Sequence, residues 1–398
     1  MFLLWVLPAI LFFPSLFYYF VQDDFYLLLI SQAKTLNEFF LFFIPLADTV
    51  WYRPLSSQVF FFVSQLIFGA NPFPFHLIVL VTHLLTIWFL YKLLVAFNIA
   101  KISAKIGALF YGMHQIHTVS LSWLSAYSFI LGPMFLVLFF YTVHKKKYFV
   151  SGLYFLLGLL TTEVFVVALP MLYLYERLLQ QKTSKLIWVF CTLVTILLFS
   201  LRFILFPTQQ STDLYAISLG NNLFASLKFY LFRMIGVPLG FTSLPEAQKS
   251  MVVMFILIIV IMFFLGSKRI WNQSTQRPRL KFFLLWNLVG LFPFLILPNH
   301  QAPHYASFAL LGLAGLFSMV MSPNINHFRP KLTFAIIVVL LFVSNLLGVQ
   351  RTYATHWIFS RARLAEKLVE SNHLVHWVGS EEYFSLGADA AYEYFKTH

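Results

Sequence analysis

The stretch PFHLIVLVTHLLTIWFLYKLLV, from Pro74 to Val95, contains a single charged residue, Lys92. An α-helix rises about 1.5 Å per residue, so about 20 mostly apolar residues are needed to cross the roughly 30 Å hydrocarbon core of a bilayer. This stretch is long and apolar enough to do so. The sequence therefore predicts a membrane-spanning helix here.

The composition extends this prediction to the whole chain. Of 398 residues, 60% are hydrophobic, only 10% are charged, and Phe alone accounts for 49. Ordinary soluble domains carry about 25% charged residues, and the apolar side chains exceed what one soluble core could hide. We therefore expect an all-α polytopic membrane protein whose main solvent is the lipid bilayer.

Similar apolar runs recur along the chain and predict about eleven transmembrane helices. The expected spans are residues 2–21, 74–95, 104–119, 122–142, 148–162, 164–178, 186–206, 250–266, 282–298, 304–321 and 332–350. The first run has no Lys or Arg before it and no small-residue cleavage site, so we interpret it as an uncleaved helix and not as a signal peptide.

Lysine and arginine set the expected orientation, because cytoplasmic connections are usually richer in these residues. With the N-terminus inside, more than half of the 27 Lys and Arg fall in cytoplasmic connections. We interpret the net charge of +13 as a topology signal and as contacts to anionic headgroups or phosphates, and not as a nucleic-acid-binding surface. The odd number of spans then places the C-terminus outside.

Two segments do not fit a simple series of spans. Residues 54–69 are apolar but too short to cross, and four polar side chains repeat there at a spacing of seven, which is typical of an interfacial helix. These are Ser57, Gln58, Ser64 and Gln65. Residues 222–237 form either a second interfacial helix or a further span, and a span there would invert every later assignment.

The chain shows no linker, charge block or internal repeat that would divide it. We expect one membrane domain over residues 1–350. The more polar residues 351–398 would form a short extracytoplasmic tail, with a helix near 358–369.

Two adjacent carboxylates, Asp23 and Asp24, follow the first expected span. Adjacent carboxylates repel, so each raises the proton affinity of the other unless a cation or hydrogen-bond donors hold them. Such a pair suits a general base or a ligand for a divalent metal. Lys and Arg are the usual residues at a membrane edge, so we favour a functional role over a plain charged stop.

Arg53 and Glu163 are further charged candidates. Arg53 precedes Pro54 at the start of the expected interfacial helix, where a helix N-terminus and a guanidinium can both hold a phosphate. Ordinary contact with lipid headgroups is the alternative. Glu163 lies between two apolar helices with no loop around it, so it is either a functional intramembrane carboxylate or a residue at a wet helix start after two threonines.

Histidines gather at two expected helix ends. His114 and His117 end the third span, where a spacing of three puts both on one helical face and allows a metal or phosphate contact. No zinc motif completes a site there. His304 and Tyr305, with His300, lie at the outer junction of the ninth and tenth spans. Structural hydrogen bonding is the alternative for each.

Other residues inside apolar runs are interpreted as structural. His76 and His83 are seven residues apart in one span, which fits helix–helix contact. Cys191 is the single cysteine, so no intramolecular disulfide can form.

The same residues, in the same order, resemble the GT-C superfamily of membrane glycosyltransferases, which includes protein O-mannosyltransferases, aminoarabinose transferases acting on lipid A, and transmembrane-and-TPR mannosyltransferases. The likeness covers about residues 15–180. It rests on Trp51-Tyr52-Arg53-Pro54-Leu55, Phe68-Gly69-Ala70-Asn71-Pro72-Phe73, Phe75-His76-Leu77, His83-Leu84-Leu85, His114-Gln115-Ile116-His117-Thr118, Trp123-Leu124-Ser125 and Leu160-Thr161-Thr162-Glu163. Gln115 stands where the family has Pro, and Thr162 stands where Lys is common.

This resemblance implies a GT-C-like bundle with juxtamembrane helices in the first extracytoplasmic loop. It also implies a polyprenyl-phosphate-sugar donor and an acidic pair on that loop, supplied here by Asp23 and Asp24. The basic residue before Pro-Leu, Arg53, would meet the donor phosphate, with help from His114 and His117. We expect three further residues to shape the site or contact the acceptor: Glu163, His304 and Tyr305.

We therefore expect an inverting transferase that moves one sugar from a polyprenyl phosphate to a protein, lipid or glycan acceptor. It would work at the extracytoplasmic face of a bacterial-type plasma membrane rather than in the endoplasmic reticulum. Asp23 or Asp24 would be the general base, with a divalent metal at the pair left open. No nucleotide site is expected, because there is no Gly-rich phosphate loop. A transporter of lipid-linked saccharides and a catalytically silent membrane scaffold are the alternatives.

Overall fold

The computed structural model describes residues 1–47, 49–207, 215–327, 330–370 and 394. Within these residues every regular element is helical and no β-strand occurs. The prediction of an all-α protein is therefore confirmed for the described part of the chain.

Long helices form most of the bundle. They are α5 (Pro72–Ala96), α8 (Ser128–His144), α11 (Lys185–Ser200), α13 (Glu246–Trp271), α14 (Arg277–Leu295), α15 (Ser307–His327) and α16 (Pro330–Thr355). The shorter helices are α1 (Phe2–Phe12), α2 (Asp23–Ile30), α3 (Leu36–Leu41), α4 (Phe60–Phe68), α6 (Lys101–Gly112), α7 (His117–Ser122), α9 (Tyr148–Thr161), α10 (Ala168–Leu179), α12 (Asn221–Met234) and α17 (Trp357–Glu370).

Six helical stretches among the described residues are long and apolar enough to cross a membrane. They are Pro72–Ala96, Leu124–His144, Lys185–Leu205, Arg277–Leu295, Pro303–Met321 and Phe334–Thr355. Each overlaps a span expected from the sequence. The six helices indicate a multi-pass integral membrane protein, whereas the count of eleven spans stays a prediction.

The third expected span, residues 104–119, is not one continuous helix. Helix α6 ends at Gly112 and α7 begins at His117, so His114 lies in the turn between them. A Cβ at Gly112 would lie 2.4 Å from the end of the Ile87 side chain on α5, so Ile87 would have to move to admit it. The prediction that His114 and His117 share one helical face is therefore wrong.

The two segments that did not fit a series of spans are both short helices. Residues 54–69 form a π-helical turn, Leu55–Val59, followed by α4. Helix α12 has 14 residues, which at about 1.5 Å per residue is well short of a roughly 30 Å core. Its length favours the interfacial alternative over a further span.

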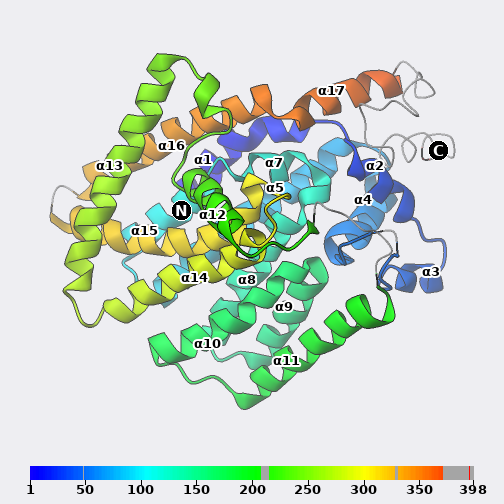
Figure 1. Cartoon of the computed structure of the whole chain (residues 1–398), viewed down its shortest axis with the longest axis horizontal. Coiled ribbons are helices and arrows are strands. Elements are labelled where there is room, and N and C mark those ends of the chain that lie inside the picture. Colours follow the sequence, from blue (N-terminus) through cyan, green and yellow to red (C-terminus); the bar gives the residue numbers. More distant parts are fainter. Residues whose placement is uncertain (48, 208–214, 328–329, 371–393, 395–398) are drawn as a thin grey trace.

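The helices pack as a bundle in which α8 contacts α5 and α9, and α15 contacts α6 and α14. Helices α14 and α15 approach closely because glycines line their contact: a Cβ at Gly290 would lie 2.8 Å from the backbone nitrogen of Ala309. Small residues of this kind are typical of helix contacts in membranes. Helices α2, α3 and α4 gather at one end of the molecule, opposite α13 (Figure 1).

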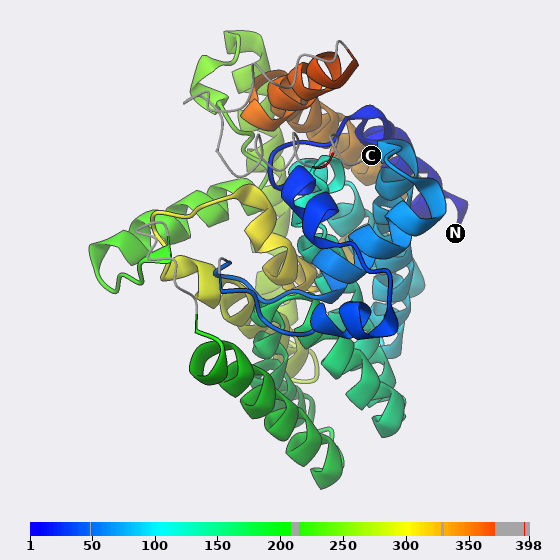
Figure 2. The same ribbon diagram turned by 90° about the vertical axis from the view of Figure 1, so that its right-hand side faces the viewer.

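The tail begins within the bundle, since α16 continues to Thr355 and is followed directly by α17. Helix α17 confirms the helix expected near residues 358–369. It lies across the same end of the molecule as α1 and α2 (Figure 2). A small apolar cluster joins it to that end: Val21, Val119, Ile358, Phe359 and Ala362.

Candidate functional site

Asp24 is a fully buried carboxylate in the first turn of α2. Its Oδ1 accepts hydrogen bonds from the Ser125 backbone nitrogen at 2.7 Å and from Ser125 Oγ at 2.6 Å, and its Oδ2 accepts one from Val21 N at 3.0 Å. Burial raises the pKa of Asp24 to about 7, although the bonds from Ser125 and Val21 act to lower it. Asp24 therefore ties α2 to the turn around Ser125.

Asp23 has a different setting from its neighbour, because its side chain is only partly buried. Burial raises the pKa of Asp23 to about 6, and a hydrogen bond with the Gln22 side chain opposes the rise. Gln22, just before the helix, adopts a positive φ of 54°, which is uncommon for a residue other than glycine. Of the two carboxylates, Asp23 is the more exposed.

Glu163 and Arg53 form an ion pair that the sequence did not reveal. Arg53 Nε donates to Glu163 Oε2 at 3.1 Å, and the other oxygen, Oε1, accepts a hydrogen bond from the backbone nitrogen of Tyr52. A third bond, from Ser56 Oγ to the carbonyl of Thr161 at 2.7 Å, joins the same two segments. The start of the π-helical turn is thus held against the end of α9.

The position of Glu163 agrees with the second interpretation of the sequence, a residue at a helix start after two threonines. It is the first residue of a short 3-10 helix, Glu163–Val167, and Thr162 caps this helix through a bond to Val164 N. Both members of its ion pair keep part of the side chain exposed, 21% for Arg53 and 22% for Glu163. The pair is therefore accessible to a ligand.

Aromatic side chains lie beside Arg53. The guanidinium lies 5.6 Å from the centre of the Phe129 ring, a distance suited to a cation–π contact. Tyr305 stacks on Phe294 with ring centres 4.7 Å apart, and its hydroxyl shares a hydrogen bond with His300 Nε2. Tyr215, in turn, lies 4.6 Å from the His300 ring.

The Tyr215 hydroxyl lies within electrostatic range of Arg53, Asp23 and Glu163. Burial raises the pKa of the Tyr215 hydroxyl, Arg53 lowers it, and Asp23 and Glu163 raise it. Burial and the nearby Arg53 likewise lower the pKa of His300. We call the following residues the charged cluster: Asp23, Arg53, Glu163, Tyr215, His300 and Tyr305. Its members come from five separate parts of the chain.

His114 and His117 lie outside this cluster. His114 Nε2 is 3.0 Å from the carbonyl oxygen of Met234, and its Nδ1 accepts a bond from Ile116 N at 3.3 Å, so both nitrogens have structural partners. His117 is fully buried between His83 and Tyr111, with ring centres 4.6 and 4.7 Å away. Neither imidazole contacts Arg53, and their role at a donor phosphate stays a prediction.

His304 is buried against the aromatic side chains of Phe129 and Tyr305 and is not part of the charged cluster. Its ring centre lies 5.1 Å from that of Phe129 and 4.7 Å from that of Tyr305. Tyr215 and Phe129, which also shape this region, were not found from the sequence. Tyr215 belongs to no motif, and Phe129 is one of many phenylalanines inside an apolar run, so composition and spacing gave no signal for either.

The acidic pair does not fit a metal site. Both oxygens of Asp24 already accept hydrogen bonds from the protein. Among the described residues, no group of three or more His, Cys, Asp or Glu side chains is arranged to hold a metal ion. We therefore assign no chemical step to a metal at Asp23 and Asp24.

Comparisons with family models, with curated proteins and with solved structures yielded no match for this chain. The resemblance to the GT-C superfamily thus stays a prediction. The charged cluster provides the physical basis for a proposed function.

Proposed function

We propose that the protein is a glycosyltransferase that moves a sugar from a polyprenyl-phosphate donor to an acceptor hydroxyl at the extracytoplasmic membrane face. One observation carries this proposal: Asp23 and Arg53, which are 30 positions apart by their numbers, act electrostatically on the same hydroxyl, that of Tyr215. A base and a cation therefore both lie within electrostatic range of that hydroxyl. Transfer from a sugar phosphate needs both, because a proton leaves the acceptor while negative charge develops on the phosphate.

Asp23 is the proposed general base. It would take the proton of the acceptor hydroxyl as that oxygen forms a bond to the anomeric carbon of the sugar. The bond from the anomeric carbon to the phosphate oxygen breaks, and its electron pair stays with the phosphate. With a pKa of about 6, Asp23 is mostly ionised at neutral pH and ready to accept a proton.

Arg53 is the proposed partner of the departing phosphate. Its Nε is occupied by Glu163, and no hydrogen bond joins its two terminal nitrogens to another described residue. Those nitrogens form a planar fork that can hold two phosphate oxygens at once. Glu163 would then act as a positioning residue that fixes the plane of the guanidinium.

The location of the cluster also supports a lipid-linked substrate. Asp23, Arg53 and Glu163 all lie outside the six long apolar helices, yet the helices around them have exposed apolar surface. The large exposed side chains of α4, the helix that follows the turn after Arg53, include Val63, Leu66, Ile67 and Phe68. A polyprenyl chain could therefore stay in the bilayer while its phosphate reaches Arg53.

The direct test is to incubate the purified protein in lipid nanodiscs with a panel of polyprenyl-phosphate sugars and candidate acceptors. We expect transfer or slow hydrolysis with at least one donor, and a loss of this activity in the Asp23→Asn variant. Glu246→Gln is a matched control, because Glu246 is 87% exposed at the start of α13, far from the cluster. Absence of both transfer and hydrolysis with every donor would count against the proposal, and movement of an intact lipid-linked saccharide across vesicles would favour a transporter.

A further inference from the structure

A second candidate binding site lies outside the charged cluster, in a groove of about 380 Å³ between the end of the first helix and α17. Its lining residues are Pro14, Phe17, Tyr18, Tyr19, Arg363 and Glu366. The volume is within the usual range for sites that bind small molecules. None of the residues around it belongs to the charged cluster.

The groove presents two opposite charges that do not neutralise each other. Arg363 and Glu366 are three residues apart on α17, so they lie on the same helical face with Cβ atoms roughly 5 to 6 Å apart. Nevertheless, neither forms an ion pair or a hydrogen bond with another described residue. A ligand that carries one positive and one negative group at a similar separation would satisfy both.

Phe17, Tyr18 and Tyr19 line the groove, and further aromatic side chains pack at this end of the molecule. The Tyr18 ring stacks on Tyr353 at 5.5 Å and lies 4.8 Å from Phe359, and Trp123 lies 5.8 Å from Trp357. Tyr and Trp are enriched at the depth of the lipid headgroups. The groove is therefore expected at that depth.

Helix α17 packs its apolar face against the protein and leaves charged side chains exposed beside the groove. It buries an apolar face made of Ile358, Phe359, Ala362 and Ala365. Arg363 and Lys367, by contrast, are exposed. Beside the groove, Phe17 is 59% exposed, which extends the site with apolar surface suited to the upper part of an acyl chain.

We propose that this groove binds the headgroup of a zwitterionic aminophospholipid, with Arg363 on the phosphate and Glu366 on the primary ammonium. In an ethanolamine headgroup, a two-carbon spacer joins the phosphate and the ammonium, and Arg363 and Glu366 line the same groove on one face of α17. Arginine pairs well with phosphate oxygens, and a carboxylate accepts hydrogen bonds from an N–H group, which a choline headgroup lacks. The proposal does not depend on the transferase reaction.

Native mass spectrometry of the full-length protein in detergent can test it, with added phosphatidylethanolamine, phosphatidylcholine or phosphatidylglycerol. We expect phosphatidylethanolamine to bind at least about five-fold more tightly than the other two lipids, as one partly exposed charge pair would provide. Arg363→Gln should weaken the binding of all three lipids, because each carries a phosphate. Glu366→Gln should weaken only that of phosphatidylethanolamine.

Lys367→Gln is the matched control, because Lys367 is exposed on the same helix but does not line the groove. It should leave all three affinities unchanged. Thermal unfolding without added lipid shows whether each variant is folded, and a variant that fails is replaced by Arg363→Lys or Glu366→Asp. Equal binding of the three lipids, preference for phosphatidylglycerol, or an equal loss in Lys367→Gln would overturn the proposal.

Discussion

Glu163 holds the guanidinium of Arg53 across a sequence separation of 110 residues, with Arg53 Nε 3.1 Å from Glu163 Oε2. Partly exposed ion pairs usually contribute little to stability. The main effect of this pair is therefore to orient the Arg53 guanidinium. The other carboxylate oxygen of Glu163 accepts a hydrogen bond from the Tyr52 backbone nitrogen, which keeps the Glu163 side chain from rotating. Arg53 is thus fixed before any ligand arrives.

The first prediction concerns this fixation. In Glu163→Gln, the amide can still accept a bond from Tyr52 N, but its NH₂ group would face the Arg53 guanidinium, which also only donates. Arg53 should lose its fixed orientation, and the donor KM should rise by about tenfold, while overall stability changes little. Steady-state kinetics with a fixed acceptor measures this, with Glu246→Gln as the control. An unchanged KM in Glu163→Gln would rule out positioning by Glu163.

The second prediction separates the two aspartates. Asp23→Asn should keep the fold and lower the transfer rate by about 10² to 10⁴, the usual effect of removing a general base. In Asp24→Asn, an NH₂ group replaces one acceptor oxygen and leaves the donor of Ser125 or Val21 without a partner. That loss should cost about 1 to 3 kcal/mol of stability. Thermal unfolding and single-turnover rates on both variants distinguish the roles, and the reverse pattern would contradict this assignment.

The third prediction is a pH dependence. A general base must be ionised, and burial raises the pKa of Asp23 to about 6, so kcat/KM should increase tenfold per pH unit below pH 6 and level off above it. The value of kcat/KM falls at low pH because protonation neutralises the Asp23 carboxylate and removes the base. The residual activity of Asp23→Asn should lack this step. A profile that is flat between pH 4.5 and 7.5 in the wild type would exclude Asp23 as the base.

Much of the fold could be predicted from the sequence, because lipid imposes a simple rule on long apolar runs. The run at 74–95 became α5, and the polar periodicity in the tail became α17. The break after Gly112 was missed, although the polar residues His114, Gln115 and His117 follow it directly in the sequence. Tertiary contacts meet the helix end: His83 Nε2 lies 2.8 Å from the Gly112 carbonyl oxygen, and Ile87 packs against Gly112.

The candidate site was only partly predictable. Asp23, Arg53 and Glu163 were found because charges stand out in a chain with only 10% charged residues. The ion pair between Arg53 and Glu163 was not predicted, because the spacing of residues along the chain gives no information about a contact across 110 positions. The distinct role of Asp24 depends on Ser125, whose importance appears only when the turn after Trp123 is folded against α2.

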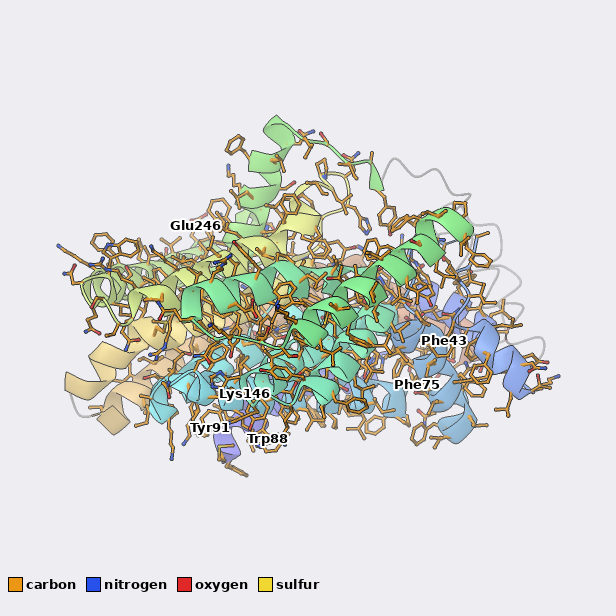
Figure 3. All side chains as sticks on the ribbon, turned by 90° about the horizontal axis from the view of Figure 1, so that it is seen from below. Phe43, Phe75, Trp88, Tyr91, Lys146 and Glu246 are labelled. Atoms are coloured by element: carbon orange, nitrogen blue, oxygen red, sulfur yellow. The ribbon has the colours of Figure 1, made fainter. Side chains whose placement is uncertain are left out.

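The fourth prediction concerns topology. Lys146 lies on the side of Trp88 and Tyr91, whereas Phe43 and Phe75 lie toward the opposite end (Figure 3). Helix α17 packs beside Val21, so Lys367 should face the same side of the membrane as Asp23, and Lys146 should face the cytoplasm. In a Cys191→Ser background, a membrane-impermeant maleimide added to intact cells should label Lys367→Cys but not Lys146→Cys. Labelling of only Lys146→Cys would invert the topology.

The last prediction concerns the Arg53 guanidinium itself. If its terminal nitrogens grip two phosphate oxygens, lysine is a poor substitute, because a point charge cannot reproduce the fork. Arg53→Ala should therefore impair donor use more than Arg53→Lys, and both should be impaired. A contact that is equal in the ground and transition states would raise only the donor KM, whereas one that strengthens as charge grows on the phosphate would also lower kcat.

We expect both constants to change, with a fall in kcat of about 10² to 10³ in Arg53→Ala, because phosphate is the leaving group and its charge increases along the reaction. An arginine that only contacts lipid headgroups would behave differently, since it would tolerate Lys and even Gln with small effects. Measuring kcat and donor KM for Ala, Lys and Gln at position 53 separates these cases. Near-wild-type kinetics for Arg53→Gln would eliminate the phosphate clamp and leave Glu163 with a purely structural partner.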